Sequence, residues 1–303
     1  MFRKYTCFVW KRKRSFCFFL TFASIKMYNM KSLVYFLILC CCCGRLSAQT
    51  YDELVGKAMD AIEADSLYDA EKWLKEALNK EPAHMGNSLL LSNLGTIQRR
   101  MGKSKEALES YTLALNKSPH SVKMLLNRAS LYLELDYLEK AYLDYCNVID
   151  LSPKNKEALQ FRAYIYMRQR RYNEARNDYR ALLEEEPANR TARIGMVMVN
   201  QKDRRYKEAM DELNRLIADY PQDASLLKAR AELEVDMEAL DLALLDLEEA
   251  AKKTPNDAEI YVLCGDTYLM QGKKREAYVA FEKAIELGVP RPELQEKLKA
   301  SKK

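Results

Sequence analysis

The stretch YNEARNDYRALLEEEPAN, at residues 172–189, reads as one charged amphipathic helix that stops at a proline. Its outline returns along the chain as LEKAYLDYCNVIDLSPKN (138–155), YKEAMDELNRLIADYPQD (206–223) and LDLALLDLEEAAKKTPND (240–257). In each copy an alanine is followed by apolar residues four and seven positions later, intervals that keep all three on one helical face. The proline ends the helix, because it lacks a backbone N–H and disfavours the α conformation in the residue before it. The chain therefore repeats a helix with one buried face.

The repeat has a period close to 34 residues. Its prolines stand at positions 82, 119, 153, 187, 221, 255 and 290, and the alanine column is Ala70, Ala107, Ala141, Ala175, Ala209, Ala243 and Ala277. Twelve residues before these alanines stand Ala58, Gly95, Ala129, Ala163, Val197, Ala231 and Gly265, and four residues after them stand Leu74, Tyr111, Tyr145, Tyr179, Leu213, Leu247 and Phe281. Small residues on two successive helices allow their backbones to approach closely, and the large residue fills the space beside the crossing. Each unit is predicted to be a helix–turn–helix hairpin.

A 34-residue helical hairpin with these small, alanine, large apolar and proline columns resembles the tetratricopeptide repeat. Seven such units are expected within residues 49–291, at 51–84, 88–121, 122–155, 156–189, 190–223, 224–257 and 258–291. The resemblance implies an all-α fold, a right-handed superhelical solenoid. Residues 292–303 begin with Pro292, which is favourable in the first turn of a helix, so we expect a C-terminal capping helix.

The fifth unit departs most from this pattern. Arg193 stands where the family has an early tryptophan, and Asn200 replaces the tyrosine seen at Tyr132, Tyr166 and Tyr268. We expect this unit to be locally looser than the others. The extra residues at 84–87 predict a longer linker between the first two hairpins.

Residues 1–48 are predicted to be a leader. The segment MKSLVYFLILCCCCGRLSA (30–48) has a lysine, an eleven-residue apolar run and a polar stretch that ends at Ala48, which is the layout of a secretory signal peptide. Residues 1–26 resemble translated upstream sequence, so Met27 or Met30 is the expected start. Cleavage after Ala48 would export the protein to the periplasm or cell envelope. The cysteines at 40–43 leave a lipoprotein open, and an uncleaved anchor is the third alternative.

Composition argues against catalysis and nucleic-acid binding. The net charge of +5 arises in the leader, and residues 49–303 hold 40 basic and 44 acidic residues, a net charge of −4. His84 and His120, the two histidines, lie beside prolines at expected exposed turns. Only Cys146 and Cys264 lie outside the leader, too far apart along a solenoid to form a disulfide. We find no nucleotide-binding, hydrolase or metal motif, so no enzyme activity, cofactor, metal or small-molecule substrate is expected.

The resemblance implies a concave groove, lined mainly by the first helix of each unit, that holds a peptide or partner protein. The residues expected to face it are Asn93, Thr96, Arg99, Arg100, Lys123, Asn127, Ser130, Gln160, Tyr164, Met167, Arg168, Met198 and Gln201. Several of them could instead pack between neighbouring hairpins. The arginine-rich segment from Arg162 to Lys207 is either a solvated surface or a site for an acidic partner.

Two functions follow from these observations. The first is a non-enzymatic protein-binding scaffold of the periplasm or cell envelope. The second is a lipid-anchored structural or assembly subunit of an envelope membrane complex, docked through the convex face or the ends of the solenoid.

Overall fold

The computed structural model describes residues 49–302, so the predicted leader at residues 1–48 lies outside the described residues. Helices account for every regular element from Tyr51 to Lys302, and the predicted all-α fold is confirmed. The helices are α3 (Tyr51–Glu63), α4 (Leu67–Lys80), α5 (Asn87–Arg100), α6 (Ser104–Lys117), α7 (Val122–Glu134), α8 (Leu138–Leu151), α9 (Lys156–Arg168), α10 (Tyr172–Glu185), α11 (Arg190–Lys202), α12 (Tyr206–Asp219), α13 (Ala224–Asp236), α14 (Leu240–Lys253), α15 (Ala258–Met270), α16 (Lys274–Glu286), η1 (Arg291–Leu294) and α17 (Gln295–Lys302).

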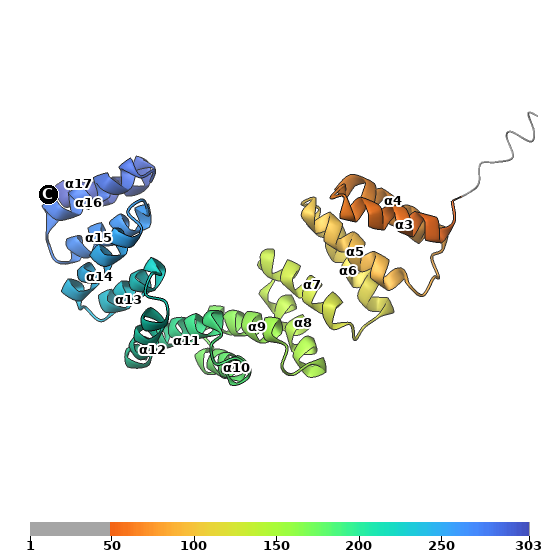
Figure 1. Cartoon of the computed structure of the whole chain (residues 1–303), viewed down its shortest axis with the longest axis horizontal. Helices are drawn as coiled ribbons and strands as arrows, with labels where there is room; N and C mark the ends of the chain where they lie inside the picture. Colours follow the sequence, from red (N-terminus) through yellow and green to blue (C-terminus); the bar gives the residue numbers. More distant parts are fainter. Residues whose placement is uncertain (1–48, 303) are drawn as a thin grey trace, which may run out of the picture. The chain divides into compact units, whose positions relative to one another are not determined.

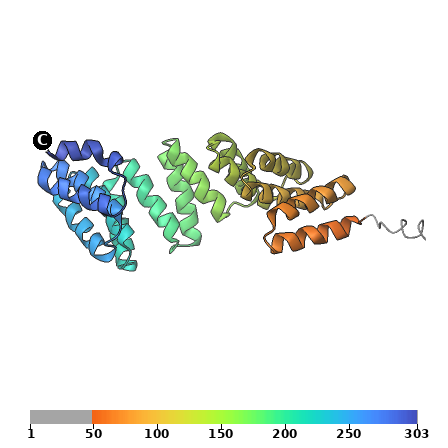
Figure 2. The same ribbon diagram turned by 90° about the horizontal axis from the view of Figure 1, so that it is seen from above.

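The helices pack as consecutive pairs within two compact units (Figure 1 and Figure 2). The first unit ends at Pro82 and contains the α3–α4 hairpin, and the second begins at Ala83 and contains α5 to α17. The division falls at the longer linker between the first two hairpins. Within the second unit, each helix from α5 to α16 packs against the next helix along the chain. The odd-numbered members α3 to α15 are called the first helices below, and their partners α4 to α16 the second helices.

The repeated columns form the core. All seven column alanines are fully buried, and the large residues that follow them are at most 5% exposed. The residue twelve positions before each column alanine must be small for a steric reason. At Gly265 an added Cβ would overlap the ring of Phe281, and at Gly95 it would overlap the ring of Tyr111. Close approach of the two helices of a hairpin therefore depends on the small residue opposite the large one.

Every first helix ends in a left-handed residue at the same place, the fifteenth of its unit. The seven residues are Asp65, Gly102, Asp136, Arg170, Arg204, Glu238 and Gly272, with φ between 57° and 74°. The amide after this residue donates a hydrogen bond back to the eleventh residue, as from Arg171 to the Tyr166 carbonyl at 2.8 Å. This Schellman ending satisfies the last carbonyls of the first helix and starts the second.

The fifth unit is joined to the fourth by polar contacts of Asn200 as well as by the packing of α11 against Tyr179 of α10. Asn200 is 6% exposed and accepts a hydrogen bond of 3.1 Å from Arg176 of α10. Arg176 also donates to Asp203 at 2.6 Å. At Gly195 an added Cβ would overlap the ring of Tyr179, so α11 approaches α10 of the preceding unit closely. Asn200, which weakens the sequence pattern, thus takes part in a buried hydrogen-bond network with α10, and the looseness expected of the fifth unit stays a prediction.

The predicted C-terminal helix covers the end of the second unit. Leu294 of η1 and Leu298 of α17 are buried against Phe281 and Ala284 of α16. Pro292 lies within the first two residues of η1, where its missing N–H costs no hydrogen bond. Gln295, Glu296, Lys299 and Lys302 of α17 are exposed and polar. The apolar edge of the last hairpin is thus covered by a largely hydrophilic helix.

Candidate functional site

All thirteen residues expected to face a groove lie on the first helices α5, α7, α9 and α11. Their exposure differs. Thr96, Arg100, Lys123, Tyr164, Arg168 and Met198 are exposed, whereas Asn93, Arg99, Asn127, Ser130, Gln160, Met167 and Gln201 are half-buried. The exposed group includes two large apolar side chains, Tyr164 and Met198, which are 39% and 46% exposed. Exposed aromatic and methionine side chains on a regular helix are available to a ligand.

Several of these residues connect consecutive first helices. Arg99 donates to Ser130 at 3.0 Å, and its Nε donates to Glu134 at 2.9 Å. Arg168 donates to Asp136 at 3.2 Å and to the Tyr164 hydroxyl at 3.0 Å. Apart from the Arg168–Tyr164 bond, which lies within α9, these bonds join side chains about one unit apart in sequence. They fix the spacing of the first helices as well as shaping the surface.

Met198 and Gln201 border two hollows on the C-terminal half of the second unit. The first, of about 280 Å³, lies between α11 and α13 and is lined by Ile194, Val197, Met198, Leu226 and Ala229, among others. We call it the α11–α13 cavity. The second, of about 290 Å³, is lined by residues of α11, α13, α14 and α15 and is called the α13–α15 cavity. Gln201, Lys202 and Glu232 line both, so the two cavities are adjacent.

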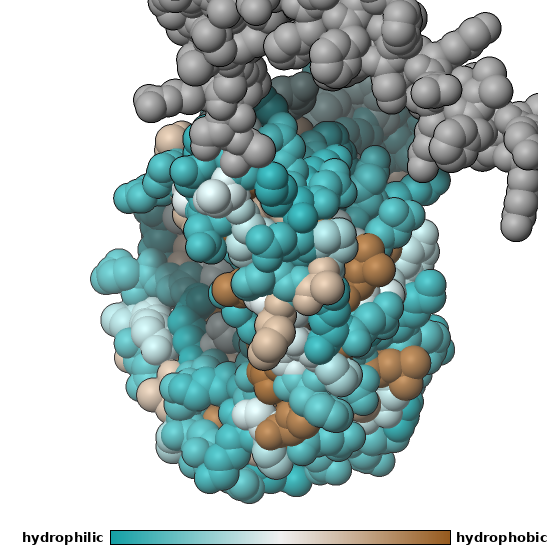
Figure 3. Space-filling view, turned by 90° about the vertical axis from the view of Figure 1, so that its right-hand side faces the viewer, coloured by the Kyte–Doolittle hydropathy of each residue, from teal (hydrophilic) through white to brown (hydrophobic). Residues whose placement is uncertain are grey.

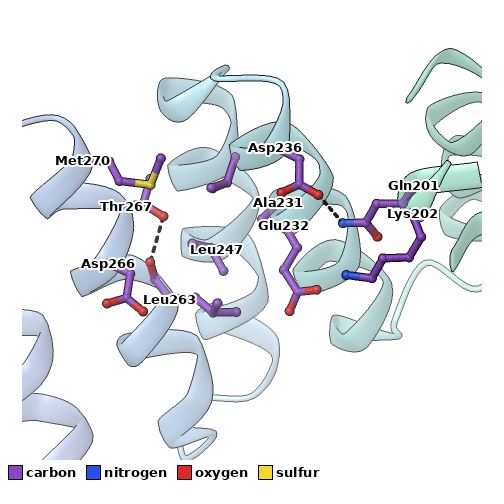
Figure 4. Close-up of a pocket in the computed structure, with 11 residues that line it drawn as sticks. Gln201, Lys202, Ala231, Glu232, Asp236, Leu247, Leu263, Asp266, Thr267 and Met270 are labelled. Atoms are coloured by element: carbon purple, nitrogen blue, oxygen red, sulfur yellow. Dashed lines mark hydrogen bonds between the residues drawn. The ribbon is translucent and has the colours of Figure 1, made fainter. Parts of the chain in front are cut away.

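The α13–α15 cavity combines apolar and acidic groups (Figure 4). Apolar side chains come from three helices, with Ala231 and Val235 on α13, Leu247 on α14, and Leu263 and Met270 on α15. Three carboxylates, Glu232, Asp236 and Asp266, stand among them. Thr267 is buried and donates its hydroxyl proton to the Leu263 carbonyl at 2.8 Å, as Figure 4 shows.

Two of the three carboxylates already have partners. Asp236 accepts a hydrogen bond of 2.7 Å from Gln201, and Asp266 lies 2.6 Å from Lys297 of α17. For Glu232 no hydrogen bond or ion pair is found within residues 49–302. Burial raises the pKa of Glu232 above its ordinary value, and the charges of Glu259 and Asp236 raise it further. Lys228 and Lys202 oppose this shift only in part. The nearby positive charges thus only partly compensate the negative charge of the Glu232 carboxylate.

The acidic residues of this cavity are absent from the predicted groove residues, which come from units two to five. The signal was present in the sequence. Glu232 and Asp266 occupy the ninth place of units six and seven, the same place as Tyr164 and Met198. Extending the same register by two units would have included them.

The arginine-rich segment is largely neutralised within the protein. Arg162, Arg168, Arg171, Arg176, Arg190, Arg193 and Arg205 each form an ion pair with an aspartate or glutamate. Such pairs leave little positive potential for an acidic partner.

The face of the molecule in Figure 3 is mostly hydrophilic, with hydrophobic side chains in separate patches.

Other site chemistry is limited in the part of the chain that the structure describes. No group of three His, Cys, Asp or Glu residues there could hold a metal ion. None of the described helices combines the length and apolar character needed to cross a bilayer. Cys146 and Cys264 are both free, and burial raises the pKa of Cys264 to about 11, which keeps its thiol protonated at neutral pH. His84 and His120 are exposed, as expected.

Paired helices stacked in sequence order, with hollows over the first helices, define a helical-repeat scaffold. Family models described as tetratricopeptide repeat match residues 166–233, 122–155 and 258–287. A crystal structure of a tetratricopeptide repeat protein from Parabacteroides merdae ATCC 43184 is 38% identical, with a TM-score of 0.69, and the match covers 84% of this chain and 99% of that one. The chain belongs to the tetratricopeptide-repeat family.

More distant structures share the fold alone. PilW, described as a widely conserved type IV pilus biogenesis factor, is 19% identical with a TM-score of 0.55, over 71% of this chain and 98% of its own. The APC/C hetero-tetramer Cut9–Hcn1 is 12% identical with a TM-score of 0.55, over 85% of this chain and 56% of that one. No curated protein matches the chain. Tetratricopeptide repeats build protein–protein interaction scaffolds, typically without enzyme activity, and this chain has that architecture.

Proposed function

We propose that the protein is a non-enzymatic scaffold that binds a peptide or partner protein in the groove over its first helices. The observation that supports it is the pair of adjacent cavities over α11, α13 and α15, bordered by Met198 and Gln201. Methionine surface beside amide and charged groups suits an extended polypeptide, because apolar side chains and backbone polar groups are recognised together.

The groove residues proposed to contact the partner are the thirteen expected from the sequence. Tyr164 and Met198 test them best, because both are exposed and their truncation should leave the fold intact. The experiment is affinity capture with the tagged full chain, produced in a bacterial host close to its source, followed by crosslinking. The Tyr164→Ala/Met198→Ala double variant should lose the captured partner. Leu245→Ala, at an exposed apolar residue of α14, is the control and should retain the partner.

The alternative, a lipid-anchored assembly subunit, predicts the reverse result. Exposed apolar residues on second helices, such as Leu143 on α8, Leu245 on α14 and Val279 on α16, favour this docking mode. Loss of the partner in Leu245→Ala, with the Tyr164/Met198 variant unaffected, would support it and contradict groove binding.

We further propose export to the periplasm or cell envelope. The support is the signal-like sequence of residues 30–48, which ends at Ala48. Cell fractionation and N-terminal sequencing test it. A mature chain beginning at Gln49 supports cleavage, and a lipid-modified cysteine from 40–43 supports a lipoprotein. A chain retained in the cytoplasm with its leader intact contradicts both.

A further inference from the structure

The two cavities over the first helices are spaced for an extended chain. One lies between α11 and α13, and the other reaches from α13 to α15, with Glu232 lining both. Packed helices are about 10 Å apart, and an extended peptide rises about 3.3 Å per residue. Because successive side chains of an extended strand point to opposite faces, side chains two or four residues apart on one bound strand can enter neighbouring cavities.

The α11–α13 cavity suits an apolar side chain. Ile194, Val197, Leu213 and Leu226 contribute aliphatic surface, and the exposed thioether of Met198 closes one side. A flexible methionine at the rim adapts to aliphatic or aromatic side chains of different shape. Burying one such side chain is favourable through the area that it removes from water.

The α13–α15 cavity suits a long cationic side chain. Val235, Leu247 and Leu263 can contact an aliphatic stem, while Glu232 stands at the rim without a hydrogen bond or ion pair among the described residues. Asp236, whose partner Gln201 is neutral, adds negative potential. The charge of Asp266 is offset by Lys297, and Lys202, which also lines the cavity, opposes part of the remaining negative potential. Lysine and arginine have this combination of an apolar stem and a charged end. A metal ion does not suit the cavity, because no three described acidic, His or Cys groups converge closely enough to hold one.

We infer that this groove binds an extended segment that places an apolar side chain in the α11–α13 cavity and a lysine or arginine, two or four residues away, against Glu232 in the α13–α15 cavity. The inference rests on the proposed function and specifies the partner's chemistry.

The test is selection of peptides of about twelve residues from a random phage-displayed library on the immobilised full chain. Selected peptides are then synthesised with a fluorescent label, and their Kd is measured by anisotropy. We expect enriched sequences to pair Lys or Arg with Leu, Ile, Met or Phe two or four positions apart. Glu232→Gln should weaken their binding about fivefold, and Glu232→Lys about thirtyfold or more. Higher ionic strength should weaken wild-type binding more than that of Glu232→Gln.

The matched control is Glu276→Lys on α16, an exposed carboxylate that lines neither cavity, and it should change Kd less than about twofold. Met198→Glu should relax the selection for the apolar residue only. Enriched peptides without a basic residue, or Kd values insensitive to Glu232→Lys, would overturn the inference. If such peptides still require Tyr164 and Met198, groove binding itself stands. Failure to enrich any peptide also overturns the inference, and partner capture by the Tyr164/Met198 pair then decides the proposed function separately.

Discussion

At the scale of single residues, the turns inside the hairpins contain backbone strain, which substitution by glycine should relieve. Arg170 and Glu238 have φ of 60°, a conformation in which a Cβ atom is crowded and glycine is not. Both side chains are exposed. Arg170→Gly and Glu238→Gly should each raise the free energy of unfolding by about 0.5–1 kcal/mol. Urea unfolding followed by circular dichroism measures the change. Gly102→Ala, at the same place with φ of 74°, is the opposite control and should lower the midpoint.

A second residue-scale effect comes from Glu234 on α13. It is 7% exposed and its Oε2 lacks a hydrogen-bond partner. Burial, and then the charge of Asp246, raise its pKa to about 7, although Arg230 opposes them. The folded protein therefore holds this proton to higher pH than the unfolded chain does. The stability contributed by the protonated form is complete below the unfolded pKa and is lost as pH rises through about 7.

Glu234→Gln removes this titration, so its advantage over wild type should depend on pH. At about pH 8 the variant should be more stable by about 1–3 kcal/mol, and near pH 4 the two proteins should be equally stable. Denaturant midpoints measured across this range check the prediction. Glu276→Gln, on the exposed surface, should show a difference from wild type that does not vary with pH. A flat Glu234→Gln difference would mean that the wild-type side chain stays ionised in the folded protein.

At the scale of helices, three hairpins share an ion pair between their two members. Arg128–Asp144, Arg162–Asp178 and Arg230–Asp246 each join a first helix to its second helix by two hydrogen bonds of 2.6–2.8 Å. In each pair the aspartate is buried. The seventh unit has Cys264 and Ala280 at the corresponding places, where both join the apolar cluster between hairpins. The hairpin can therefore be closed by a charged or an apolar pair.

Removing one member of such a pair should lower the free energy of unfolding far more than replacing both members. Asp178→Ala should lower the free energy of unfolding by about 3 kcal/mol, because the half-buried Arg162 loses its counter-ion. Arg162→Cys combined with Asp178→Ala, which copies the seventh unit, should lie within about 1 kcal/mol of wild type. A double-mutant cycle on unfolding free energies measures this coupling. Additive losses would show that the pair contributes to stability as two independent side chains.

The sequence predicts the hairpins well, because one set of columns specifies both the helical face and the close crossing. Ala175, Tyr179 and Pro187 of the fourth unit have counterparts with the same role in every other unit, so each repeat strengthens the prediction for the others. The groove was less predictable. Whether Arg99 points to a ligand or to Glu134 depends on contacts 35 residues apart, which follow from the packing of neighbouring units. The non-glycine turn residues, such as Arg170, were missed because no side chain there signals a positive φ.

At the scale of the whole molecule, each hairpin of the second unit packs against the hairpins adjacent to it in sequence, so the exposed end of this stack needs separate protection. In the second unit this protection is α17, whose Leu298 covers Phe281 and Ala284 of α16. In such repeat arrays stability is close to a sum of unit and interface terms. A substitution that weakens the capping helix α17 should therefore destabilise only the hairpin next to it.

Leu298→Ala should destabilise α15 and α16 while leaving α5 to α8 almost unchanged. The expected loss is about 2–4 kcal/mol at the cap, from the transfer of a buried leucine and the cavity that remains. Amide hydrogen exchange of the full chain, resolved by peptide, measures it helix by helix. Lys299→Ala, at an exposed residue of the same helix, is the control and should alter no region. If exchange rises equally from α5 to α17, the second unit unfolds as one cooperative block, and the interfaces between hairpins must be stronger than the hairpins themselves.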